Sequence, residues 1–208
     1  MTKSFHIVVF LIVSVICGCS SSSMSEDNRG VMYKDIPSTA YSVAENDSVI
    51  VFLNEECIED SMEGLSPIKQ VSLWMYNRNK KEGRMILLSH PQTNMAFLNM
   101  EHSVCIPLDS IPTITKVTIL SWPNEPMKLL AEGCSDYRNV ESFIINEDSN
   151  SAICLPTNRG LIGISEEDGL LIMQSYDYYE DGGRYNIIEA YDDRGNRISS
   201  MNAKTRNL

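Results

Sequence analysis

The amino-acid sequence predicts an all-β fold built from antiparallel hairpins. Three observations support this prediction. Short apolar runs rich in β-branched residues recur along the chain, turn-forming Gly, Asn and Asp residues separate them, and helical patterns are few and short. The length beyond the first two dozen residues suits one domain, so we expect a single all-β domain over residues 35–208.

Up to residue 122, three runs predict strands, and they span residues 48–53, 71–76 and 116–122. Two other segments carry signals for about two turns of helix. One is Glu55 to Gly64. The other runs from Pro126, which suits a first helical turn, to Gly133, which suits a helix end.

In the C-terminal half, turn signals divide the chain more regularly. Residues 146–150 predict a break before a strand at residues 152–155, and turns follow at residues 158–160 and 167–169. The clearest hairpin joins residues 170–179 to residues 184–192 through Glu180, Asp181, Gly182 and Gly183. A further reversal at residues 193–196 leads into Ile198.

The strand signals also indicate an internal repeat. Ser48, Ser103 and Ser151 each open an apolar strand, with spacings of 55 and 48 residues between them. This period is close to that of a β-propeller blade, about 40 to 50 residues, and predicts a small propeller-like repeat of about four units. A β-sandwich or a long antiparallel meander is the alternative.

The first residues carry a targeting signal. Lys3 precedes an apolar run from Ile7 to Ile16, which is shorter than the roughly 20 residues that span a membrane. Ile16, Cys17, Gly18 and Cys19 resemble the lipobox of bacterial lipoproteins. The resemblance implies a signal peptide over residues 1–18, cleavage before Cys19 and acyl chains on that cysteine. Several chains anchor a protein stably, and residues 19–34 would then form a flexible tether.

The charge distribution excludes one class of partner and suggests another. The formal net charge is -11, which argues against nucleic acid because phosphates would be repelled. Between Asp35 and Ile68 there are acidic residues and no Lys or Arg, among them the acidic block of Glu55, Glu56, Glu59 and Asp60. Such a block is either an ordinary soluble surface or a face that attracts a basic partner.

The cysteines leave two interpretations open. Besides Cys19, the predicted mature chain contains Cys57, Cys105, Cys134 and Cys154. An oxidising envelope permits disulfides, and four cysteines allow three complete pairings that the sequence cannot decide. Cys105 and Cys154 lie in apolar runs, which equally suits buried thiols.

Motifs for catalysis or for a resident metal are weak. His90 and His102 have no ligand-type neighbour at a clamp spacing, and the sequence contains no G-x-S-x-G, phosphate loop or H-E-x-x-H motif. We therefore expect no catalytic residue, no metal and no cofactor. A hydrolase remains a weak alternative, because two suitably spaced carboxylates suffice for glycoside hydrolysis and carboxylates are abundant.

The tyrosines of the predicted hairpin are the best candidate binding residues. Strand alternation places Tyr176 and Tyr178 on one face, with Asp177 and Tyr179 on the other, and Tyr185 lies on the facing strand. Tyrosine combines a flat apolar ring with a polar tip and suits sugars and protein partners alike. A purely structural cross-strand ladder is the alternative.

Together these features predict a lipid-anchored, all-β protein of the cell envelope, placed at the outer membrane and facing either the periplasm or the surface. We expect it to bind a glycan or a protein without catalysing a reaction. An immunity lipoprotein that neutralises a basic toxin through the acidic block is the second hypothesis.

Overall fold

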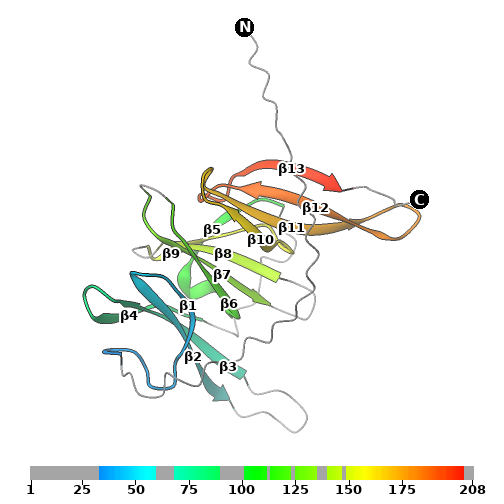
Figure 1. Ribbon diagram of the computed structural model, residues 1–208. Coiled ribbons are helices and arrows are strands. Elements are labelled where there is room, and N and C mark those ends of the chain that lie inside the picture. The colour runs from blue at the N-terminus through cyan, green and yellow to red at the C-terminus, as the bar shows by residue number, and fades with distance from the viewer. Residues whose placement is uncertain are drawn as a thin grey trace, which may run out of the picture. The chain divides into compact units, whose positions relative to one another are not determined.

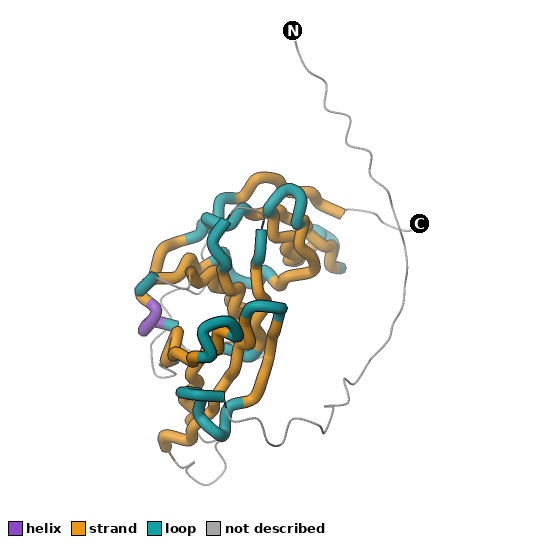
Figure 2. Tube along the Cα trace, turned by 60° about the vertical axis from the view of Figure 1, so that its left-hand side comes forward, coloured by secondary structure: helices purple, strands orange, loops and turns teal. Residues whose placement is uncertain are grey.

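The computed structural model describes residues 33–59, 68–89, 101–111, 113–122, 125–134, 140–146 and 149–203. Within these residues, antiparallel strands form three sheets (Figure 1). The helical element among them is a single 3-10 turn, η1 (Leu108–Ser110), drawn in purple in Figure 2. The predicted all-β class is therefore confirmed. Cys19 and residues 20–32 lie outside the described residues.

The first and third sheets each contain four strands in chain order. The first sheet consists of β1 (Tyr41–Glu45), β2 (Val49–Glu59), β3 (Ile68–Asn77) and β4 (Glu82–Leu88). The third sheet consists of β10 (Gly160–Ser165), β11 (Leu170–Tyr178), β12 (Arg184–Tyr191) and β13 (Arg197–Ala203).

The middle sheet has five strands in the order β5-β9-β8-β7-β6. Its members are β5 (Val104–Pro107), β6 (Lys116–Leu120), β7 (Lys128–Cys134), β8 (Val140–Asn146) and β9 (Ser151–Cys154). All three sheets thus contain a four-stranded meander, and β5 adds to the edge of the middle one.

The structure does not arrange the three segments of the suggested repeat as equivalent units. Ser48, Ser103 and Ser151 mark the beginnings of β2, β5 and β9, which occupy unlike positions in their sheets. The two similar segments around Cys105 and Cys154 pair with each other, as β5 against β9. The described strands form no closed barrel, so the three meanders are open antiparallel sheets packed together.

The middle sheet is buried on both faces. Leu129 of β7 belongs to an apolar cluster with Leu73 of the first sheet. The next residue, Leu130, belongs to a second cluster with Met173 of the third sheet. Successive side chains of a strand point to opposite faces, so the first and third sheets cover opposite faces of the middle one. This explains why its strands read as continuous apolar runs rather than alternating ones.

The turns that were predicted from Gly and Asn residues are confirmed. The predicted hairpin is β11 and β12, and Gly182 and Gly183 close it with φ of 86° and 85°. Gly169 ends the β10–β11 turn with φ of 66°, and Asn158 adopts φ of 62° before β10. A positive φ is cheap for glycine and tolerated by asparagine, which is why these residues mark turns reliably.

Both helix predictions are wrong. Residues 55–59 continue strand β2, whose Glu55 lies opposite Val71 of β3, and residues 60–67 lie outside the described part. Residues 128–134 form β7, which pairs with β6 and β8 on its two sides. Gly133 is needed there for space rather than as a helix end, since a Cβ would lie 2.3 Å from the Thr113 carbonyl oxygen. Pairing with neighbouring strands outweighs a weak local helix signal.

We predict that both faces of the middle sheet contribute strongly to stability. Phe143→Ala and Leu130→Ala each remove a side chain with 0% exposure and should lower the free energy of unfolding by about 3 to 4 kcal/mol. Ile162, which is 51% exposed in β10, provides the control, and Ile162→Ala should change it by about 0.5 kcal/mol or less. Urea denaturation measures all three. A cost at Ile162 equal to that at Leu130 would contradict the two-sided packing.

Candidate functional site

The predicted tyrosine residues form an organised surface at the turn end of the β11–β12 hairpin. Tyr176 and Tyr178 share one face, 42% and 63% exposed, with ring centroids 5.8 Å apart in an edge-to-face arrangement. Arg184, opposite Tyr178 in the ladder, places its Cζ atom 4.8 Å from the centroid of the Tyr176 ring. We call these three residues the tyrosine surface.

The other face of the hairpin holds the remaining tyrosines, as strand alternation predicted. The Tyr185 hydroxyl donates a hydrogen bond to Asp177 Oδ2 at 2.9 Å, and this bond raises the pKa of Tyr185. The Tyr179 and Tyr185 rings lie 4.9 Å apart. These contacts fix the backbone geometry beneath the tyrosine surface.

The acidic block is less negative than its sequence suggests. Glu55 Oε2 pairs with Lys69 Nζ at 2.7 Å, and the Tyr41 hydroxyl donates to Glu55 Oε1 at 2.9 Å. These two hydrogen bonds, that from Lys69 first, lower the pKa of Glu55. Glu56 accepts from Asn54 Nδ2 at 2.9 Å. The side chain of Glu59 and all of Asp60 lie outside the described part of the structure.

A pocket of about 630 Å³ lies at the other end of β12, where the β12–β13 turn meets β5 and β9. Sequence reasoning did not predict this pocket. Its lining combines basic, polar and apolar residues: Glu101, His102, Ser103, Val104, Cys105, Ile153, Pro156, Tyr191, Arg194, Gly195, Asn196 and Arg197.

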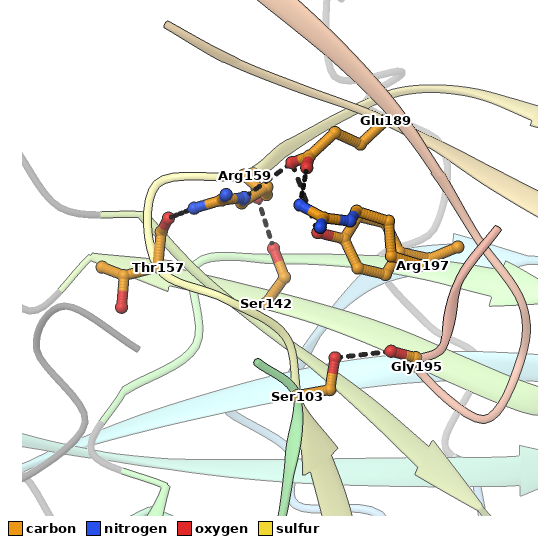
Figure 3. A network of polar contacts seen from close by, with 8 residues as sticks. Ser103, Ser142, Thr157, Arg159, Glu189, Gly195 and Arg197 are labelled. Carbon is orange, nitrogen blue, oxygen red and sulfur yellow. Dashed lines mark hydrogen bonds and ion pairs between the residues drawn. The ribbon is translucent and has the colours of Figure 1, made fainter. Parts of the chain in front are cut away.

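Two polar contacts attach the β12–β13 turn to the middle sheet. Ser103 Oγ donates to the Gly195 carbonyl oxygen at 2.6 Å (Figure 3). Lys128 of β7 forms an ion pair with Asp193, whose side chain is only 19% exposed. Gly195 also permits the approach itself. Its φ is 76°, and a Cβ there would lie 2.6 Å from Ile153 Cγ2.

The turn has its own internal hydrogen bonds. Asp192 Oδ1 accepts the backbone N–H groups of Arg194 and Asn196 at 2.9 and 2.8 Å, and Asp192 Oδ2 accepts from Asn196 Nδ2 at 2.9 Å. Burial alone would raise the pKa of Asp192, but these hydrogen bonds outweigh it and the pKa is lowered. These hydrogen bonds stabilise the turn that presents Arg194 to the pocket.

A charged network lies beside the pocket, centred on Glu189 of β12 (Figure 3). Glu189 is 2% exposed and accepts hydrogen bonds from Arg159 Nε at 2.8 Å and Arg197 Nη1 at 3.0 Å. The Tyr191 hydroxyl donates to Glu189 Oε2 at 3.3 Å. Arg159 also donates to the Thr157 carbonyl oxygen at 2.7 Å. Burial alone would raise the pKa of Glu189, but the two arginines hold it below its ordinary value of 4.5.

The cysteines contribute thiols at two different depths. Cys105 is exposed and lines the pocket with His102, whereas Cys154 is buried, and both are thiols without a disulfide. Burial, with a smaller contribution from Glu141, raises the pKa of Cys154 to about 12, so this thiol stays protonated and unreactive. Cys57 lies exposed in β2, and the side chain of Cys134 lies outside the described residues.

The described residues show neither a metal-binding cluster nor a membrane-spanning helix. In this part of the chain, no group of three or more His, Cys, Asp and Glu side chains is arranged to hold a metal ion. No helix in the same part is long and apolar enough to cross a membrane. Comparison of the chain with protein-family models, curated proteins and solved structures found no match.

The sequence did not predict the pocket because the walls of the pocket come from three segments that are distant in the sequence. These are residues 101–105, 153–156 and 191–197. The sequence did show the β12–β13 turn and the paired segments around Cys105 and Cys154 as distinct features. What it could not show is that they meet.

We predict that the Glu189 network stabilises the fold in a pH-dependent way. Glu189→Gln leaves Arg159 and Arg197 without their shared carboxylate and should lower the free energy of unfolding by about 3 kcal/mol near neutral pH. Because the folded-state pKa lies below 4.5, the unfolded chain takes up the proton first as pH falls. The contribution of Glu189 is therefore present above pH 4.5 and declines below it.

Urea denaturation at several pH values from about 3 to 7 tests this prediction. Glu189→Gln should show a weaker loss of stability below pH 4.5 than the native chain does. Glu45→Gln serves as the control, because Glu45 pairs with Arg78 on the exposed surface and its loss should cost about 1 kcal/mol or less. If the free energy of unfolding depended on pH in the same way in Glu189→Gln and in the native chain, protonation of Glu189 would not be coupled to unfolding, and the prediction would be contradicted.

Proposed function

We propose that this chain is a lipid-anchored protein of the cell envelope that binds a glycan through the tyrosine surface and catalyses no reaction. The observation that supports the binding proposal is the exposure of Tyr176 and Tyr178 on one face of a rigid hairpin. Contact between an apolar aromatic ring and water is unfavourable. A ligand that covers the two exposed rings removes this contact and is therefore favoured.

A glycan suits the chemistry of this surface. The Tyr178 ring, 63% exposed, offers a flat apolar face to the C–H groups of a sugar. Arg184 and the tyrosine hydroxyls supply hydrogen-bond partners for sugar hydroxyls at the same place. The surface contains one formal charge, so we expect glycan binding to depend little on salt. A protein ligand is the alternative that the experiment below distinguishes.

The immunity hypothesis is supported less well. It relies on negative charge that remains available to a basic toxin, and Glu55 already pairs with Lys69 from the neighbouring strand. An exposed carboxylate with such a partner attracts a second cation weakly. We therefore keep the tyrosine surface as the proposed binding site.

The anchor is a separate part of the proposal and rests on the lipobox-like residues Ile16 to Cys19. We predict that cells grown with an alkyne analogue of palmitate label the native protein and leave Cys19→Ala unlabelled. The native protein should also partition into the detergent phase because of its acyl chains. Cys57→Ala is the matched control and should keep the label. Labelling of Cys19→Ala would contradict lipidation at that residue.

For the binding site, we predict that Tyr176→Ala and Tyr178→Ala each weaken retention on a glycan array by about tenfold or more. Tyr41→Ala provides the control, because Tyr41 is 45% exposed but lies in β1 of the first sheet. Binding should change little between low and high salt. A parallel pull-down could recover a protein instead of a glycan. If both tyrosine variants failed to recover that protein, the ligand of the tyrosine surface would be a protein rather than a glycan. Binding that Tyr41→Ala reduces equally would contradict the site.

A further inference from the structure

The pocket at the β12–β13 turn carries an excess of positive charge. Among the described residues, Arg194 and Arg197 line it, and Glu101 is the one acidic lining residue. This excess is notable in a chain whose formal net charge is -11. The pocket is also far from the tyrosine surface. Tyr191, which lines the pocket, lies seven positions after Arg184 of the tyrosine surface on β12, which corresponds to about 23 Å along a strand.

The Glu189 network holds Arg197 in position and leaves positive charge beside the pocket. Glu189 has one negative charge, which Arg159 and Arg197 share. The Arg197 side chain is 52% exposed while its Nη1 atom is bound to Glu189. A guanidinium has five N–H donors in a planar fork, so this contact leaves donors for a ligand. Arg197 is thus oriented by Glu189 and still accessible to a ligand in the pocket.

The remaining walls define the body of the ligand. Val104, Ile153 and Pro156 give the pocket an apolar side. A volume of about 630 Å³ lies within the usual range for small-molecule sites, about 300 to 1,000 Å³. A ligand that contacts both the arginines and this apolar side has an anionic group and an apolar part. Glu101 on the lining repels a second negative charge, which disfavours polyphosphates and dicarboxylates.

We propose that this pocket binds a small monocarboxylate with an apolar body. The planar carboxylate accepts hydrogen bonds from both guanidinium groups, Arg194 and Arg197, and the apolar body lies against Val104, Ile153 and Pro156. This site is independent of the tyrosine surface and does not rest on the proposed function. The hydrogen bond between Ser103 and Gly195 joins two of the three segments that form its walls.

Isothermal titration of the purified full chain with 4-phenylbutyrate tests the proposal. We expect saturable binding of one molecule per chain. The uncharged amide of the same compound lacks the anion, and acetate lacks the apolar body, so each should bind at least about tenfold more weakly. Binding of the amide as tight as that of the acid would overturn the carboxylate assignment. Absence of saturable binding by 4-phenylbutyrate would overturn the proposal.

Three variants locate the site. Arg194→Gln should weaken binding at least about tenfold, because a charge-assisted hydrogen bond is lost. Arg78→Gln removes the same charge from the first sheet, where Arg78 pairs with Glu45, and should leave binding unchanged. Glu101→Gln removes a like charge and should tighten binding severalfold. Weaker binding in Glu101→Gln, or no effect of Arg194→Gln, would overturn the proposal.

Discussion

The burial of the middle sheet on both faces is the constraint on which the rest of the structure depends. Leu129 packs toward the first sheet and Leu130 toward the third. Polar groups in such a sheet need partners within the protein, because water does not reach them. Glu132 Oε1 of β7 accepts the backbone N–H of Leu161 at 3.1 Å, and Glu132 Oε2 forms an ion pair with Lys116 Nζ at 2.6 Å. The first of these contacts also joins the middle sheet to β10 of the third.

The junction between the middle and third sheets combines stability with binding chemistry. Glu189 would be costly to bury alone, and Arg159 and Arg197 compensate its charge. Arg197 belongs also to the pocket, so the contact that stabilises the junction also orients a residue of the pocket lining. The tyrosine surface, in contrast, extends beyond the packed part of the third sheet. Substitutions there should therefore affect binding with little effect on folding.

Charge in this protein is organised by strand pairing rather than by position along the chain. The acidic stretch that contains Glu45 and Glu55 has no basic residue of its own, yet Arg78, which follows β3, and Lys69 of β3 pair with these two carboxylates. The partners are separated by 33 and 14 residues in the sequence. A run of like charge therefore predicts surface exposure more safely than it predicts an electrostatic binding face.

The sequence by itself determined the all-β class, the turns at Gly169, Gly182 and Gly195, and the faces of Tyr176 and Asp177. These features depend on backbone conformations of single residues and on strand alternation, both of which are local. Only the tertiary structure decided that residues 128–134 form a strand, that Lys69 neutralises Glu55, and that Ser103 meets Gly195 across a pocket. Each of these depends on which distant segments pack together, and packing outweighs local propensity when many buried contacts favour one arrangement.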